Sequence, residues 1–292
     1  MSRPGLDTNP LELTPDWFNQ LFEEIGIDAE VSGLTAKSIG TGQIGENVRF
    51  VFDYARKGDG APATLVGKFP SDNEASLMTA KMLGHYEREV NFYRTFPKVA
   101  GRITPAALYT DYDAETNRFA LIMEDMAPSE QGDQLAGCSV AEAERAMDAA
   151  AILHAAYWND ETLDTYPWLQ GTSVADGPFA LTHNDYRLDN MLFGKPGAPK
   201  PLAVVDWQTV GKGAPASDVA YFIGAGLTRE DRPKHEQALL RYYHARLQDE
   251  GVTDYGFDAL FDDYRYTCFY GMSVAFGAAM LVKQTGRGDQ MF

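Results

Sequence analysis

The chain has 292 residues, enough for one large domain or two smaller ones. Hydrophobic residues make up 45% of it and charged residues 23%, a globular balance that excludes a disordered, collagen-like or coiled-coil chain. The formal net charge of −17 at pH 7 repels phosphate backbones and anionic lipid surfaces, so nucleic acid is not an expected partner.

The chain offers little for a disulfide framework, a structural zinc site or a membrane anchor. Its two cysteines, Cys138 and Cys268, lie far apart and lack Cys-x-x-Cys spacing, which fits a reducing compartment. The N-terminus has no apolar signal core, and the apolar stretch 272–282 is too short for a bilayer core of about 30 Å. A soluble, cytoplasmic protein without a membrane partner is expected.

The first part of the chain predicts an antiparallel sheet with one inserted helix. Helical spacing around Trp17–Phe22 is followed by a change to strand patterns, in which Val48, Phe50 and Phe52 alternate with more polar positions. The predicted strands cover parts of 36–69, then 107–112 and 119–123, and the predicted helix covers 75–96. Turn residues at 57–60 separate two of the strands.

After Asp125 the composition changes to a loop rich in Pro, Gly and Ser, then to mostly helical patterns starting with 141–156. Short apolar segments at 179–182, 191–193 and 202–205 interrupt the helices. We therefore expect an α+β, two-lobed protein. The N-terminal lobe would be a small sheet lobe of residues 1–125, and the C-terminal lobe a larger helical lobe of residues 126–292.

The most informative residues follow two of these apolar segments. Asp185 and Asn190 lie five residues apart in one loop, and Asp206 ends a buried strand. Phosphoryl transfer needs a carboxylate near the attacking hydroxyl and oxygen ligands that hold Mg²⁺ against nucleotide phosphates. Asp185 supplies the former, and Asn190 with Asp206 supply the latter.

These residues resemble the aminoglycoside phosphotransferase and choline kinase group, including its ecdysteroid-kinase-like members, over about residues 39–221. The family pattern is His-x-Asp-x-x-x-x-Asn followed by an Asp after a strand, matched here by His183, Asp185, Asn190 and Asp206. The resemblance implies a bilobed protein-kinase-like fold with ATP and Mg²⁺ as cofactors. Asp185 would be the catalytic base, Asn190 and Asp206 the metal ligands, and His183 a structural residue. Many members carry an acidic residue where this chain has Gln208.

Two further residues near this pattern have more than one interpretation. Arg187 stands where protein kinases carry a lysine that steadies the transferred phosphoryl group, so it is a candidate catalytic residue. The alternative is a surface arginine paired with Asp189. Asp218 resembles the family's Pro-x-x-Asp element, which is a structural anchor.

Upstream, Gly40, Gly42 and Gly45 form Gly-x-Gly-x-x-Gly. A dinucleotide fingerprint must open a helix, whereas the pattern that follows here is a strand, as in the loop that covers ATP phosphates in kinases. The three glycines are therefore predicted to bind the nucleotide.

Lys68, which ends the second strand of this hairpin, is the candidate phosphate-binding lysine, with a glutamate on the next helix as its ion-pair partner. Glu89 is favoured over Glu87 because residues 88–93 resemble the family's Arg-Glu-x-x-Phe-Tyr helix. Without the downstream pattern, both residues would read as ordinary solvated side chains.

Residues 121–126 resemble the segment between the lobes whose backbone binds adenine in family members. The main chains of Glu124 and Met126 are the candidates there. An edge strand followed by a helix cap would give the same pattern.

The acceptor is predicted to be a small-molecule alcohol, because the short stretch between Asp206 and Asp218 cannot form a peptide-binding platform. The C-terminal half is rich in aromatic residues, which could bind amine cations or simply pack. A hydrophobic alcohol is an equally open alternative.

Three functions are weighed. The first is an ATP- and Mg²⁺-dependent kinase that phosphorylates a small-molecule hydroxyl. The second is a nucleotide-binding pseudokinase or scaffold, whose usual mark, loss of one of the key residues, is absent. The third is a metal-dependent hydrolase using His183 and Asp185, which lacks the further ligands such a site needs.

Overall fold

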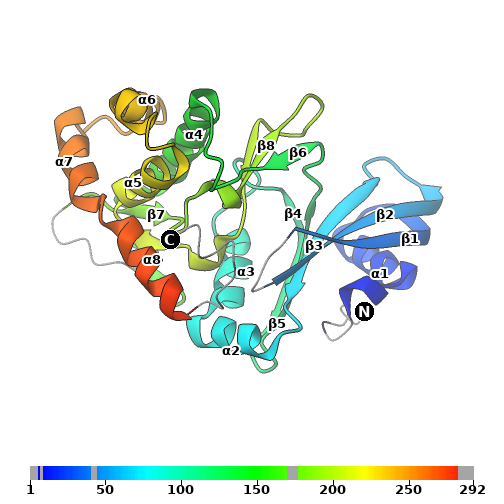
Figure 1. The fold of residues 1–292 in the computed structure, drawn as a ribbon. Helices are drawn as coiled ribbons and strands as arrows, with labels where there is room; N and C mark the ends of the chain where they lie inside the picture. Colours follow the sequence, from blue (N-terminus) through cyan, green and yellow to red (C-terminus); the bar gives the residue numbers. More distant parts are fainter. Residues whose placement is uncertain (1–5, 7–8, 41–44, 170–176, 282–292) are drawn as a thin grey trace. The chain divides into compact units, whose positions relative to one another are not determined.

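The computed structural model describes residue 6 and residues 9–40, 45–169 and 177–281 (Figure 1). The chain divides into two compact units, residues 1–125 and 126–292, called the N-terminal unit and the C-terminal unit below. No helix in the described ranges combines the length and apolarity needed to cross a membrane.

The N-terminal unit is built on a five-stranded antiparallel sheet with the strand order β1-β2-β3-β5-β4. The strands are β1 (Ala29–Ile39), β2 (Gly45–Lys57), β3 (Thr64–Pro70), β4 (Ala107–Asp113) and β5 (Arg118–Glu124). The sheet starts earlier than the sequence predicts. Asn19 receives the backbone N–H of Val31 at 2.7 Å and donates to its carbonyl at 3.1 Å, which fixes the first strand to the preceding helix.

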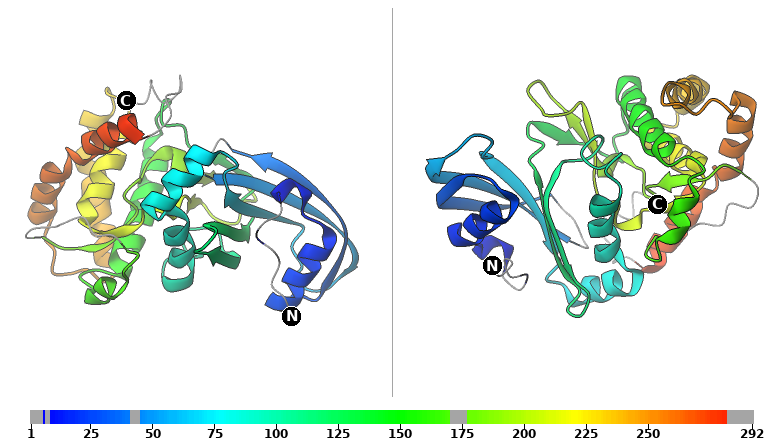
Figure 2. Two further views of the ribbon diagram at one scale, coloured as in Figure 1. Left: turned by 90° about the horizontal axis from the view of Figure 1, so that it is seen from below. Right: turned by 180° about the vertical axis from the view of Figure 1, so that it is seen from behind.

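The core of this unit forms between the sheet and helix α1 (Pro15–Ile25), which follows a short 3₁₀ helix, η1 (Pro10–Glu12) (Figure 2). Thr14 caps the helix by accepting from the N–H of Trp17. The Phe18 ring lies 4.8 Å from both Phe50 and Phe52, measured between ring centroids. The alternation along β2 thus points its phenylalanines into the core.

The single helix predicted over 75–96 is wrong, because the structure has two helices there. These are α2 (Glu74–Leu83) and α3 (His85–Thr95). Gly84 lies between them with a φ of 66°, a left-handed conformation that ends α2 and that glycine adopts without steric cost.

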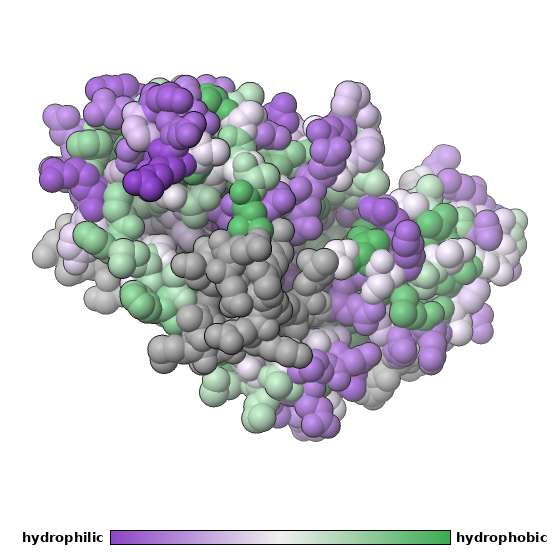
Figure 3. Space-filling model, in the orientation of Figure 1, coloured by the Kyte–Doolittle hydropathy of each residue, from purple (hydrophilic) through white to green (hydrophobic). Residues whose placement is uncertain are grey.

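The C-terminal unit is mostly helical. Its helices are α4 (Val140–Ala156), α5 (Pro215–Gly226), α6 (Arg232–Asp249), α7 (Phe257–Thr267) and α8 (Tyr270–Leu281), with 3₁₀ helices η2 (Glu161–Thr165), η3 (Leu188–Asn190) and η4 (Trp207–Thr209). Helix α4 begins with a capping box between Ser139 and Glu142 and packs on α5 and α6. Hydrophilic residues dominate the surface over α6 (Figure 3).

Two small antiparallel sheets in this unit carry the polar loops. One contains β6 (Ser129–Gln131), β8 (Met191–Gly194) and β9 (Leu202–Val204), and the other pairs β7 (Ala180–Thr182) with β10 (Gly211–Gly213). Strands β6 and β10 have no apolar alternation, so their pairing with β8 and β7 is a tertiary effect that local pattern does not signal. The α+β fold class predicted from the sequence, a small antiparallel sheet lobe and a larger helical lobe, is confirmed.

Candidate active site

The side chain of Asp185 lies in the 183–190 loop, between β7 and β8, and is surrounded by hydrogen-bond donors. Its Oδ2 accepts from Nδ2 of Asn190 at 2.8 Å and from Nε of Arg187 at 3.1 Å, and its Oδ1 accepts from the Tyr221 hydroxyl at 3.4 Å. Burial, followed by the nearby Asp185 charge, raises the pKa of Tyr221, so this hydroxyl keeps its proton. The carboxylate is thus oriented while 23% of the side chain stays exposed.

Asn190 uses its amide nitrogen twice, because Nδ2 also donates to the backbone carbonyl of Asp185 at 2.9 Å. No donor in the described residues bonds to its Oδ1. The bonds made by the nitrogen therefore fix the side chain with its amide oxygen available, and such an oxygen suits a hard cation such as Mg²⁺.

Asp206 follows β9 in a left-handed backbone conformation, with φ 67° and ψ 62°. Such a conformation is uncommon for a residue with a side chain and clusters at functional sites. The preceding residue, Val205, donates its N–H to the carbonyl of Asn190 at 2.9 Å. The two predicted metal-ligating residues are therefore held in adjoining segments, and their oxygens fit the ligand chemistry of Mg²⁺.

His183 joins the same two segments and is fully buried. Its Nδ1 accepts from the N–H of Asp185 at 3.3 Å, and its Nε2 lies 3.0 Å from the carbonyl of Val205. These partners require the neutral tautomer with the proton on Nε2. The geometry gives His183 a holding role within the loop.

Asp218, on α5, anchors the start of the loop. Its buried carboxylate accepts the backbone N–H groups of His183 at 2.7 Å and Asn184 at 2.9 Å. It also lies 3.2 Å from Nε2 of His154, whose Nδ1 is 2.7 Å from the Tyr243 hydroxyl. Burial raises the pKa of Tyr243 well above its usual value, so its hydroxyl keeps its proton beside His154.

The sequence did not predict His154, and it offered Tyr243 only as one of the aromatic residues that could bind an amine cation. The signal available was a histidine on the alanine-rich, buried face of α4, a position where a polar side chain needs a partner.

Arg187 contacts two carboxylates. Its Nε lies 3.0 Å from Oδ1 of Asp185, and its Nη1 lies 3.2 Å from Oδ2 of Asp189. Burial opposes its charge, but Asp185, Tyr221 and Asp189 raise the pKa of Arg187 above its usual value. The pairing with Asp189 that the sequence left open is present, and the guanidinium is mostly buried rather than a free surface group.

In the N-terminal unit, Lys68 on β3 forms an ion pair with Glu89 on α3. Nζ lies 2.8 Å from Oε1 and 2.7 Å from Oε2, with side-chain exposures of 8% and 1%. Glu89, and not the competing Glu87, is therefore the helix partner of the lysine.

Of the three predicted loop glycines, Gly42 lies outside the described residues. Gly40 has a φ of 76°, a conformation that favours glycine. A Cβ at Gly45 would lie 3.1 Å from the carbonyl oxygen of Phe69 and 3.3 Å from Cε of Lys68. The last glycine is thus where the chain passes closely over the lysine. Both Gly40 and Gly45 line a hollow of about 220 Å³ together with Ser38, Ile39, Glu46, Asn47, Ser71 and Asp72.

The predicted adenine-binding segment, residues 121–126, starts within β5 and runs past its end. The N–H of Glu124 donates to the carbonyl of Ala106 at 2.8 Å, so a ligand could use only the carbonyl of Glu124. The Asp125 carboxylate lies 3.0 Å from Nη2 and 2.8 Å from Nε of Arg49, a fork that fixes this residue to β2. Met126 is buried within the C-terminal unit.

Several aromatic residues of the C-terminal unit make internal contacts, whereas Tyr266 and Phe269 are exposed. Several hydroxyls donate to acidic side chains of the same unit. These pairs are Tyr242 with Asp148, Tyr255 with Asp263 and Tyr264 with Glu236. Because these hydroxyls and carboxylates already bond to one another, the contacts favour packing of the aromatic residues over a shared cation-binding pocket. In the described part of the chain, no three or more His, Cys, Asp or Glu side chains cluster as metal ligands.

Comparison with known proteins gives the same class as the loop geometry. The model of the phosphotransferase enzyme family matches residues 92–257, more than half of the chain. The match begins and ends later than the region expected from the sequence, about 39–221. No curated protein sequence matches the chain.

Solved kinase structures share the fold at low sequence identity. Choline kinase from Cryptosporidium parvum Iowa II has a TM-score of 0.60 and 8% identity, with 88% of this chain and 87% of that chain covered. Plasmodium vivax ethanolamine kinase has a TM-score of 0.53 and 9% identity, covering 94% and 86%. The GDP and kanamycin complex of APH(2")-IIia has a TM-score of 0.50 and 13% identity, covering 94% and 95%.

The fold is therefore that of the protein-kinase-like phosphotransferases. The chain belongs to the phosphotransferase enzyme family.

Proposed function

We propose that the protein transfers the γ-phosphate of ATP, with Mg²⁺, to a hydroxyl group of a small molecule. The observation that carries this proposal is the Asp185 carboxylate, held by Asn190, Arg187 and Tyr221 and still partly exposed. The family membership supports phosphoryl transfer as the reaction class.

In the proposed reaction, Asp185 orients the acceptor hydroxyl and takes its proton. The acceptor oxygen forms a bond to the γ-phosphorus while the bond from that phosphorus to the β,γ-bridging oxygen breaks, and ADP leaves with that electron pair. Arg187 would steady the transferred group by charge-assisted hydrogen bonds. Because little covalent chemistry is asked of the protein, orientation and charge account for most of the rate.

The N-terminal unit would bind the nucleotide and the C-terminal unit would supply the transfer chemistry. Lys68, kept in place by Glu89, would bind the phosphates together with the backbone near Gly40 and Gly45. The carbonyl of Glu124 and the main chain of Met126 would bind adenine. Asn190 and Asp206 would hold Mg²⁺, which when bound supplies positive charge that offsets the charge of the phosphate oxygens.

The acceptor would be a small alcohol. The similar structures are named for choline and ethanolamine or contain kanamycin, so these three compounds make the first test panel. A steroid alcohol is added to represent the hydrophobic alternative. Purified protein is mixed with ATP, Mg²⁺ and each compound, ADP release is measured, and the product is identified by mass spectrometry.

The decisive variant is Asp185→Asn, which keeps the size of the side chain and removes its capacity as a base. We expect turnover to fall by about two to four orders of magnitude, since a positioned base typically contributes 10²–10⁴-fold. Lys234→Gln, which removes an exposed ion pair on α6, is the control. Wild-type turnover by Asp185→Asn would overturn the assignment, and ATP binding without turnover by the wild type would favour the pseudokinase alternative.

A further inference from the structure

The segment that follows β6 is bonded directly to the 183–190 loop. The N–H of Leu188 donates to Oε1 of Gln134 at 2.9 Å, and the N–H of Gln134 donates to Oδ1 of Asp189 at 3.0 Å. Nε2 of Gln134 donates to the carbonyl of Ala225 near the end of α5. One glutamine therefore makes two hydrogen bonds to the loop and a third to helix α5.

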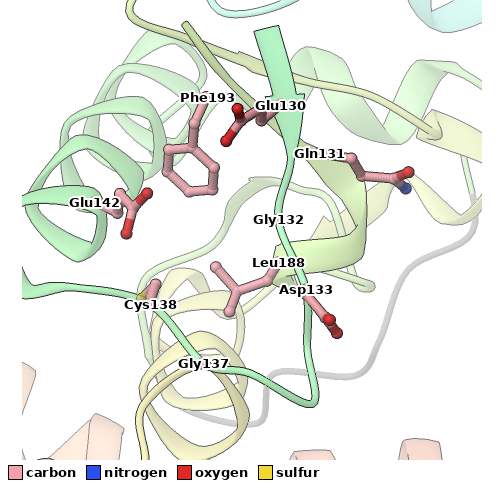
Figure 4. Close-up of a pocket in the computed structure, with 9 residues that line it drawn as sticks. All are labelled: Glu130, Gln131, Gly132, Asp133, Gly137, Cys138, Glu142, Leu188 and Phe193. Atoms are coloured by element: carbon pink, nitrogen blue, oxygen red, sulfur yellow. The ribbon is translucent and has the colours of Figure 1, made fainter. Parts of the chain in front are cut away.

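The close approach of the two segments depends on a glycine. A Cβ at Gly132 would lie 2.5 Å from the carbonyl oxygen of Leu188, which is too short for any side chain. Figure 4 shows Gly132 beside Leu188, whose side chain points into a pocket of about 110 Å³ that this segment lines. Gln131 adds a hydrogen bond of 2.6 Å from its Nε2 to the carbonyl of Asp189.

Asp189 passes this restraint on to the candidate active site. One of its oxygens accepts from Gln134, and the other lies 3.2 Å from Nη1 of Arg187. Arg187 in turn places Nε 3.0 Å from Oδ1 of Asp185. The side-chain exposures of Arg187 and Asp189 are 23% and 15%, so solvent screens this chain of contacts only in part.

We propose that Gln134 and Asp189 are positioning residues for phosphoryl transfer, acting through Arg187 on the carboxylate of Asp185. The inference rests on the proposed function, in which Asp185 is the base. Neither residue needs to touch ATP or the acceptor. Without Asp189, the Arg187 guanidinium loses a carboxylate partner and can rotate away from Asp185. Misplacement of a reacting group by 1 Å can cost about 10²-fold in rate.

Two variants separate the links. Asp189→Asn keeps an oxygen that can accept from Gln134 but loses the ion pair with Arg187. Gln134→Ala removes the bonds to Leu188 and Ala225 but leaves the backbone N–H that donates to Asp189. For each we expect kcat to fall at least about tenfold while the KM for ATP changes less than about twofold, because the nucleotide-binding residues are untouched. Gln134→Glu, which keeps the acceptor for Leu188, should recover part of the loss.

A double variant tests whether Asp189 acts through Arg187. In an Arg187→Gln background, the further change Asp189→Asn should cost less than about twofold, because the partner it positions is already gone. Hydrogen–deuterium exchange gives a readout that needs no turnover. The amide of Leu188 should exchange faster in Gln134→Ala, and at the wild-type rate in Asp189→Asn and in the surface control Lys234→Gln.

The outcomes distinguish this inference from the proposed function. ADP release is measured with the panel alcohol that is phosphorylated best, or with water if none is. If Asp185→Asn loses turnover while kcat is unchanged in both Asp189→Asn and Gln134→Ala, the positioning roles are overturned and the proposed function is not. Full additivity of the Asp189 and Arg187 changes would do the same. Absence of ADP release by the wild type would overturn the proposed function and this inference together.

Discussion

The ion pair between Lys68 and Glu89 adds little to the stability of the fold, although the proposed function needs it to bind ATP. Both side chains are almost fully buried, and an ion pair in such a place pays a large desolvation penalty that its Coulomb attraction barely offsets. Removing one partner leaves the other charged and buried, whereas replacing both by apolar residues of similar size is often neutral or stabilising.

We therefore expect Glu89→Gln to destabilise the protein by about 3–5 kcal/mol, and the double change Lys68→Met with Glu89→Leu to recover most of that loss. The double variant should still fail to bind ATP, because the phosphate-binding charge is gone. Urea denaturation measures the stability and calorimetry the binding. A double variant less stable than Glu89→Gln would show that the pair stabilises the fold.

At this scale the sequence predicted which residues come together within each unit, but it did not predict what holds them. The spacing of Asp185 and Asn190 predicted their proximity, and the structure joins them by two hydrogen bonds. Gln134 and His154 left no comparable signal, because each acts through partners distant in the chain, Leu188 and Asp218. Long-range hydrogen bonds of this kind are set by tertiary packing, which local patterns do not encode.

Among the elements, β3 carries Lys68 and depends on a close contact at the residue before it. A Cβ at Gly67 would lie 2.4 Å from Cε2 of Phe69 and 3.0 Å from Cδ1 of Ile122. Both neighbours belong to the buried core of the N-terminal unit, so they cannot move aside without disturbing it.

Gly67→Ala should therefore destabilise the protein by about 1–3 kcal/mol, the usual cost of overpacking. Gly224→Ala is the matched control. Gly224 lies inside α5 with no heavy atom near its Cβ position, so the same change should stabilise that helix by about 0.5–1 kcal/mol. Thermal denaturation of both variants compares the signs. Equal changes in stability for the two variants would mean that β3 can accept a Cβ at position 67 in spite of the close contacts.

The sequence predicted elements best where apolar residues repeat, as in β2 and α4. It failed where a single residue, or pairing with a distant strand, determines the secondary structure. Gly84 divides α2 from α3 through its left-handed backbone, and a continuous helical spacing of apolar residues concealed that break. Strand β6 forms because it pairs with the edge of β8. The residues of β6 alone have the pattern of a polar loop.

For the whole molecule, the fold is shared with kinases at 8–13% identity, so few side chains are needed to specify it. In this chain the sheet unit carries the pair of Lys68 and Glu89, and the helical unit carries the loop with Asp185 and Asn190. Each unit has its own core, and the residues proposed to bind ATP and Mg²⁺ are divided between the two.

This division makes nucleotide binding a test at the scale of the whole chain. A ligand that binds only the folded state at 100 times its Kd stabilises that state by about 2.7 kcal/mol, which for a chain of this size raises Tm by roughly 5 °C. We expect ATP with Mg²⁺ to produce such a shift, and ATP alone to produce a smaller one.

Asp206→Asn should lose only the part of this Tm shift that depends on Mg²⁺, because Lys68 and Glu89 are unchanged. Asp231→Asn, at an exposed ion pair, controls for the loss of a negative charge. A shift that is independent of Mg²⁺ in the wild type would remove Asn190 and Asp206 from the metal site, and no shift with any nucleotide would leave the chain a scaffold with the fold of a kinase.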